Sequence, residues 1–141
     1  MKQFYSIDLK ECSVVIVKFI LILIFSYSAF SKIISYSTFL NALVKSPVIP
    51  YNFVKTVGNF VIIIELGLSV LLLFSGRSRL SLILSTFLMA FFTGYMLIIY
   101  YLSPYIPCSC GGVIEKLSWT DHIVFNIVVT SLAAFGVKFS K

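Results

Sequence analysis

Four long apolar stretches, separated by shorter and more polar segments, dominate the pattern of hydrophobic and polar positions along this chain. They run from Ser13 to Phe30, Val54 to Phe74, Leu80 to Leu102 and Asp121 to Phe139. A helix rises about 1.5 Å per residue, so about 20 residues cross the roughly 30 Å hydrocarbon core of a bilayer. Each stretch is close to that length. Because lipid cannot hydrogen bond to backbone groups, the pattern predicts four membrane-spanning helices.

The segments between the stretches are short. The basic gap from Ser75 to Arg79 is only long enough for a turn, so the second and third stretches should form an antiparallel hairpin. No internal repeat and no low-complexity linker divides the chain, which predicts a single domain over residues 1–141. A polar arm precedes the first stretch and no small-residue cleavage pattern follows it, so we do not expect a cleavable signal peptide.

The composition agrees with a protein that lies in lipid. Of the 141 residues, 60% are hydrophobic and 11% are charged, which is more apolar surface than so short a soluble domain could bury. The net charge of +6 comes from Lys and Arg residues scattered between the apolar stretches. That scatter is typical of membrane topology signals, and it argues against nucleic acid as a partner. We therefore expect an all-α membrane protein, built as a four-transmembrane-helix bundle.

The distribution of positive charge predicts the orientation of the bundle. With four spans, both termini and the gap between the second and third spans share one side. The basic residues of that side are Lys2, Lys10, Lys18, Arg77, Arg79, Lys138 and Lys141. Those of the other side are Lys32, Lys45, Lys55 and Lys116. Because basic residues are enriched in cytoplasmic segments, we expect both termini in the cytoplasm and a multi-pass location in the bacterial cytoplasmic (inner) membrane.

Two cysteines form the most reactive motif of the chain, in the predicted outer segment between the third and fourth spans. Cys108 and Cys110 are two residues apart and can form a disulfide if the backbone bends. Gly111 and Gly112 supply backbone freedom beside them, and Pro107 helps to end the preceding helix. So small a ring is strained, and strained, exposed disulfides are easily reduced. An oxidising outer compartment would favour such a pair.

His122 should lie near this pair. Ser118 and Asp121 resemble a capping box that begins the fourth helix, which places His122 in its first turn. The positive end of the helix dipole would favour a thiolate nearby. His122 is therefore a candidate for tuning the cysteines, while Trp119 is more typical of an anchor at the membrane interface.

The residues alone leave several roles open for the cysteine pair. It can be a redox-active pair, a structural disulfide, two unreactive thiols, or ligands to copper or zinc with His122 as a third ligand. Cys12, on the predicted cytoplasmic side, is expected to be an ordinary reduced thiol.

Glu65 is the second candidate functional residue, because it lies near the middle of the second apolar stretch. A carboxylate at that depth is costly, so it should face the bundle interior and have a partner. We expect this partner to be Lys18 or a polar group such as Tyr27, Tyr95 or Asn126. Glu65 would then either satisfy a buried hydrogen bond or transfer protons during thiol oxidation.

Two further patterns bear on the interior of the bundle. Gly58, Gly67 and Ser69 are small enough to let another helix approach the second span closely. Asn126 lies one turn after His122 on the same helix face. The pattern thus predicts a polar stripe from the cysteine segment into the bundle.

Several of these residues together resemble the MauE family, which belongs to the wider DoxX-like group of small membrane proteins. They are Ser31-Lys32-Ile33, Glu65-Leu66-Gly67, and the segment from Cys108-Ser109-Cys110-Gly111-Gly112 through Leu117-Ser118-Trp119 to Asn126. The resemblance covers nearly the whole chain. It implies action with a periplasmic or extracytoplasmic thiol–disulfide protein, coupling to a membrane quinone, and Cys108 and Cys110 as the redox pair.

One departure limits what the resemblance implies. Membrane proteins that generate disulfides, such as DsbB and vitamin K epoxide reductase, use two cysteine pairs, whereas residues 32–55 of this chain hold no cysteine. A partner would have to supply the second dithiol. Three functions stay open: a thiol–disulfide redox protein, a non-enzymatic assembly subunit with a structural disulfide, and a metal-handling or solute transport protein. The last is least favoured, because no span is visibly interrupted.

Overall fold

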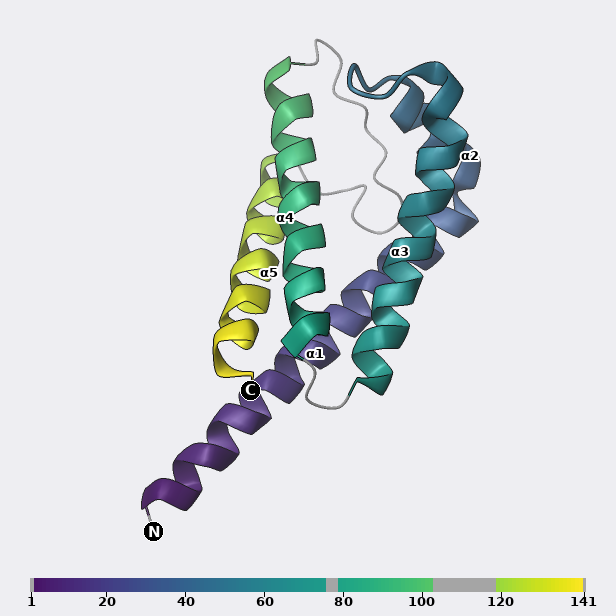
Figure 1. Ribbon diagram of the computed structural model, residues 1–141. Helices are drawn as coiled ribbons and strands as arrows, with labels where there is room; N and C mark the ends of the chain where they lie inside the picture. The colour runs from purple at the N-terminus through teal and green to yellow at the C-terminus, as the bar shows by residue number, and fades with distance from the viewer. Residues whose placement is uncertain (1, 76–78, 103–118, 141) are drawn as a thin grey trace.

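The computed structural model describes residues 2–75, 79–102 and 119–140, and every regular element in these residues is a helix (Figure 1). In chain order the elements are α1 (Lys2–Ile34), α2 (Tyr36–Val44), the short 3-10 helix η1 (Tyr51–Phe53), α3 (Val54–Phe74), α4 (Arg79–Leu102) and α5 (Trp119–Phe139).

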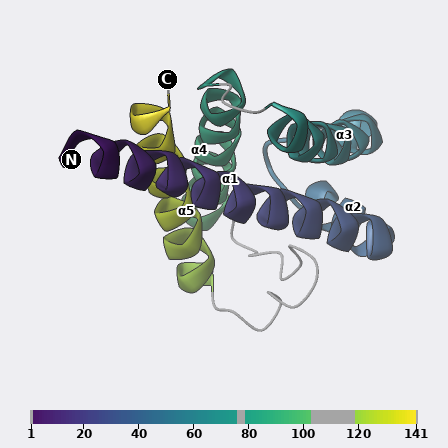
Figure 2. The same cartoon turned by 90° about the horizontal axis from the view of Figure 1, so that it is seen from below.

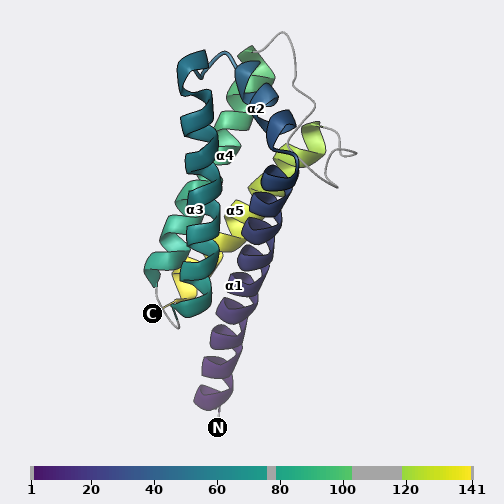
Figure 3. The same cartoon turned by 90° about the vertical axis from the view of Figure 1, so that its right-hand side faces the viewer.

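Four of these helices are long and apolar enough to cross a membrane, as the sequence predicts. The spans cover Glu11–Ile34, Tyr51–Phe74, Arg79–Leu102 and Thr120–Phe139. The boundaries of α3 and α4 agree with the expected stretches to within a residue. The helix α1 begins at Lys2, so the polar arm before the first apolar stretch is helical too, and Figure 3 shows it extending past the other helices. That arm contains no glycine or proline to interrupt a helix.

The sequence did not predict α2 and η1, which fill most of the connection between α1 and α3. The buried side chains of α2 are Phe39 and Leu43, and they pack with Val54 and Ile62 of α3 in a small apolar cluster. The helix α2 has only nine residues, so its amphipathic pattern is short, and it lies in the sequence between two long apolar helices. Without the neighbouring α3, so short a pattern is a weak helix signal.

Gly58 explains how closely α2 approaches α3. A Cβ atom added to Gly58 would lie 2.8 Å from Leu40 Cδ2 and 3.4 Å from both Leu43 Cδ1 and Phe39 Cε1. The expectation of a close helix approach is therefore confirmed at Gly58. It is wrong at Gly67, where an added Cβ would have no heavy atom of a neighbour within 4 Å.

The main core joins α1 to α3, α4 and α5. Its fully buried members include Leu21 and Phe25 of α1, Leu82 of α4 and Ala133 of α5. The most extensive contacts are those of α4 with α5 and of α1 with α3. Figure 2 looks along the bundle with α1 in front: α4 and α5 lie nearer the N-terminal end of α1, and α2 and α3 lie nearer its C-terminal end.

The start of α1, the end of α3, the start of α4 and the end of α5 lie at one end of the bundle (Figure 1), as an even number of spans requires. At that end, Lys18 Nζ donates a hydrogen bond of 2.8 Å to the backbone oxygen of Ser75 at the end of α3. Ser75 Oγ in turn donates to Ser81 Oγ of α4 at 2.9 Å. This polar cluster ties α1 to the α3–α4 hairpin.

Candidate functional site

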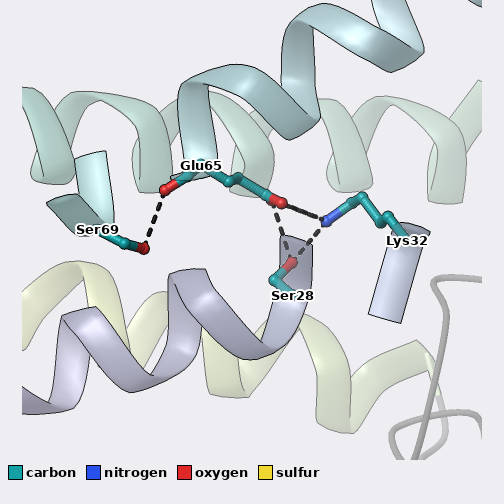
Figure 4. A network of polar contacts seen from close by, with 4 residues as sticks. All are labelled: Ser28, Lys32, Glu65 and Ser69. Atoms are coloured by element: carbon teal, nitrogen blue, oxygen red, sulfur yellow. Dashed lines mark hydrogen bonds and ion pairs between the residues drawn. The ribbon is translucent and has the colours of Figure 1, made fainter. Parts of the chain in front are cut away.

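The polar centre of the bundle is an ion pair between α1 and α3 (Figure 4). Lys32 Nζ lies 2.8 Å from Glu65 Oε1 and 3.0 Å from Oε2. The Glu65 side chain is only 1% exposed and that of Lys32 only 14%. An ionised carboxylate in so dry a place needs an opposite charge and hydrogen-bond donors, and Lys32 supplies both.

Two serines complete the surroundings of the ion pair. Ser28 lies one turn before Lys32, accepts a hydrogen bond from Lys32 Nζ and donates one of 3.1 Å to Glu65 Oε1. Ser69 Oγ donates to the backbone oxygen of Glu65 at 3.0 Å. Both carboxylate oxygens therefore have donors, which is the condition for a buried ion pair to be tolerated.

The prediction that Glu65 faces the bundle interior is confirmed, but the expected ionic partner, Lys18, is wrong. Lys18 lies about four turns before Lys32 in α1 and bonds to Ser75 at the other end of the bundle. By its place in the sequence, Lys32 is expected among the basic residues of the outer side rather than in an ion pair. A signal was present nonetheless: Lys32 follows Ser28 by one turn, which places two polar groups on one face of an otherwise apolar span.

Two aromatic rings flank the Lys32 ammonium group. Its Nζ atom lies 5.7 Å from the ring centroid of Phe39 in α2 and 5.8 Å from that of Phe92 in α4. Both distances are within the range of a cation–π attraction. Lys32 thus contacts groups from α1, α2, α3 and α4, and it lies where these helices converge.

A cavity of about 510 Å³ adjoins the ion pair. Most of its wall is apolar and aromatic, with contributions from α1, α2, α3, α4 and α5. The polar side chains in the wall are Tyr27, Ser28, Lys32, Glu65, Tyr95, His122 and Asn126. An apolar cavity with a few polar groups is the usual form of a small-molecule site.

His122 and Asn126 bring α5 to this cavity. The backbone oxygen of His122 accepts a hydrogen bond of 3.1 Å from Asn126 Nδ2, which also lies 3.4 Å from Met96 Sδ of α4. The predicted placement of His122 in the first turn of α5, on the face of Asn126, is confirmed. Nδ1 of His122 is buried and has no hydrogen-bond partner among the residues that the structure describes.

The structure brings Glu65 and His122 to the wall of one cavity. Cys108 and Cys110 fall outside the described residues, and so does Ser118 of the expected capping box. Cys12 lies in α1 as an exposed free thiol. Within residues 2–75, 79–102 and 119–140, no group of three or more His, Cys, Asp or Glu side chains is placed to hold a metal ion.

Comparison with known proteins places this chain in a family. A family model described as "Methylamine utilisation protein MauE" matches residues 10–139, which includes all four spans and every residue of the cavity wall. No curated protein and no solved structure matches the chain. The match over nearly the full length, on four helices long enough to cross a bilayer, shows that this multi-pass membrane protein belongs to the MauE family.

Proposed function

We propose that this protein supports thiol–disulfide exchange with exported partner proteins, through Cys108 and Cys110. The observation that carries the proposal is the ion-paired cavity. Its wall includes His122, which is only twelve positions after Cys110 in the sequence. Membrane-embedded ionisable groups are costly and are usually kept for function. Here the carboxylate of Glu65, the ammonium group of Lys32 and the imidazole of His122 lie in the wall of one cavity.

The chemistry of exchange explains why such groups would be useful. A thiolate of the partner attacks the Cys108–Cys110 disulfide and forms a mixed disulfide, and the second partner thiolate then releases a reduced Cys108–Cys110 pair. The partner is oxidised by two electrons and the pair is reduced by two. The partner's thiols lose two protons, and the released cysteines take up two. Groups that hold and release protons near the pair would support these steps.

The proposed orientation puts the cysteines on the side where exported proteins are found. Seven basic residues accompany the termini and the α3–α4 connection, against four on the other side (Lys32, Lys45, Lys55 and Lys116). Lys32 is used in the ion pair with Glu65, so it is a weaker topology signal than its charge suggests. We therefore propose that both termini are cytoplasmic and that the α4–α5 connection is outside.

A labelling experiment tests this orientation. In intact spheroplasts treated with reductant, a membrane-impermeant maleimide should label Cys108 and Cys110 but not Cys12. In permeabilised cells the maleimide should label all three cysteines. A Cys12→Ser variant and a Cys108→Ser/Cys110→Ser variant identify which thiols are labelled. Labelling of Cys108 and Cys110 only after permeabilisation would overturn the orientation and the compartment on which the proposed function depends.

Trapping the thiols tests the function itself. Cells are quenched with acid, free thiols are alkylated with a maleimide carrying a polyethylene glycol mass tag, and the mass of the protein is read on a gel. A cycling pair should show both reduced and oxidised fractions, and the oxidised fraction should fall when a reduced Cys-x-x-Cys peptide is added to membranes. A pair that stays fully oxidised would instead indicate the structural disulfide of an assembly subunit.

A further inference from the structure

The helix α3 has two faces with different surroundings. Its buried positions are Val54, Gly58, Ile62, Glu65, Leu68, Ser69 and Leu72. This buried face packs against α1, α2 and α4. On the opposite face, the side chains of Ile63 and Leu73 are both 65% exposed and that of Val70 is 54% exposed. Because α3 is long and apolar enough to cross the membrane, these side chains face either lipid or another protein.

The exposed face of α3 follows the heptad repeat of a coiled coil. In this repeat of seven positions, a to g, the residues at a and d contact the neighbouring helix, and the steps between them alternate between three and four residues. Along α3 this spacing places Thr56, Ile63 and Val70 at a, and Asn59, Leu66 and Leu73 at d. Leu66 is half-buried and the other five are exposed. We call these six residues the α3 seam.

The residue types of the α3 seam are those that favour a parallel pair of helices. A β-branched residue at a, combined with leucine at d, favours two parallel strands. Ile63 and Val70 supply the β-branched side chains at a. Leu66 and Leu73 supply leucine at two of the three d positions in α3. Copies of one membrane protein inserted with the same orientation hold α3 parallel, so a second copy of this chain fits the pattern.

Asn59 gives the α3 seam a polar group deep in the membrane. It lies about 5 Å from the middle of the span Tyr51–Phe74, at 1.5 Å per residue, where no water is present to bond with an amide. Tyr36 of α2 donates a hydrogen bond of 2.7 Å from Oη to Asn59 Oδ1. Asn59 Nδ2 has no acceptor among residues 2–75, 79–102 and 119–140. The amide therefore has donors available for a neighbour in the membrane.

A second copy of the chain satisfies these donors, whereas lipid does not. About a two-fold axis along the membrane normal, each d position faces the same position of the other copy at the same depth. Nδ2 of one Asn59 can then donate to Oδ1 of the other, which has a second lone pair. An acyl chain offers no acceptor. Apolar contacts alone would not favour a second helix over lipid, because lipid tails are as apolar as leucine, so the amide pair supplies the preference.

We propose that the α3 seam is the interface of a parallel homodimer, in which the two Asn59 amides bond to one another near the middle of the membrane. The cavity beside the Lys32–Glu65 ion pair stays accessible in such a dimer. The α3 residues in its wall are Val57, Val61 and Glu65, which lie on the other side of the helix from the seam. The proposal goes beyond the proposed function and involves none of the cysteines.

Cysteine cross-linking in native membranes tests the interface. The full-length protein with Cys12, Cys108 and Cys110 changed to serine receives one new cysteine, by Ile63→Cys or Val70→Cys. Oxidation with copper phenanthroline should join two copies in both variants, because facing a positions of a packed pair lie within the roughly 4.4–6.8 Å Cα separation of a disulfide. Leu71→Cys is the matched control, since Leu71 is also exposed and adjoins Val70 but lies outside the seam. It should give little linked dimer.

Three outcomes of the cross-linking would overturn the proposal. Equal linking in all three variants would indicate random collision of copies in the membrane. A linked product whose mass is not twice that of the chain would show that a different membrane protein occupies the seam. Absence of any product in the Ile63→Cys and Val70→Cys variants would show that the seam faces lipid.

Replacing Asn59 measures the contribution of the amide pair. Energy transfer between donor-labelled and acceptor-labelled copies, in vesicles of increasing lipid-to-protein ratio, gives the dissociation constant of the dimer. Asn59→Leu should raise this constant about 3- to 30-fold, the range for one hydrogen bond between helices in a membrane. Tyr36→Phe is the control, because it removes the bond from Tyr36 and keeps the amide. An unchanged constant in Asn59→Leu, or an equal rise in Tyr36→Phe, would contradict the amide pair.

Discussion

Replacing Lys32 by methionine should lower the stability of the folded protein by about 3–5 kcal/mol, the cost of leaving a buried charge without its partner. Glu65 is 1% exposed, and among the described residues Lys32 Nζ donates two of the three hydrogen bonds that its carboxylate accepts. Without Lys32, the bond from Ser28 is the one that the Glu65 carboxylate keeps within the described part of the chain, so this carboxylate must either stay charged in a dry site or take up a proton. Both are costly. Unfolding in detergent micelles, followed by circular dichroism against increasing sodium dodecyl sulfate, measures the loss.

Adding Glu65→Leu to Lys32→Met should restore most of the lost stability, because the second change removes the unpaired charge. This rescue distinguishes loss of the ion pair from loss of the packing that the Lys32 stem provides. Lys18→Met is the control, since it removes a buried lysine of α1 whose partner is a neutral backbone oxygen. A Lys32→Met protein as stable as wild type, or no recovery in the double variant, would show that the ion pair is unimportant for the fold.

The four spans could be predicted from the sequence because lipid restricts the backbone conformations that a long apolar run can adopt. An apolar run of sufficient length in a bilayer can satisfy its backbone only as a helix, so run length alone determines α3 and α4 to within a residue. The short helix α2 has no such constraint. It depends on a tertiary contact, the close approach over Gly58, which involves residues 39 to 43 of another helix. A local pattern does not contain that information.

The candidate site was predictable in part, and for a physical reason. A glutamate in the middle of an apolar span must face the interior, so burial of Glu65 follows from solvation cost. Its partner does not follow, because Lys18 and Lys32 both lie in the first span and only the crossing of α1 over α3 decides which of them reaches Glu65. The cavity is a property of five helices together. His122 and Asn126 could be placed on one helix face from their spacing, but the wall they share with Lys32 could not.

Replacing either Cys108 or Cys110 by serine should abolish thiol exchange while the protein still inserts at its normal level. Serine has nearly the same size as cysteine but cannot form a disulfide, so one change removes the two-electron step completely. The two cysteines act as one unit, and the double variant should therefore be no worse than either single variant. Turnover is measured as oxidation of a reduced Cys-x-x-Cys peptide by membranes containing equal amounts of each variant.

The matched control for this experiment is Cys12→Ser. Cys12 is an exposed free thiol in α1, and it should contribute nothing to turnover if the chemistry belongs to the α4–α5 connection. His122→Ala should slow exchange without stopping it, since an imidazole can favour a thiolate but forms no bond to sulfur in the product. Full turnover in both Cys108→Ser and Cys110→Ser would rule out the redox function. Loss of turnover in Cys12→Ser alone would instead identify Cys12, near the start of the first span, as the reactive thiol.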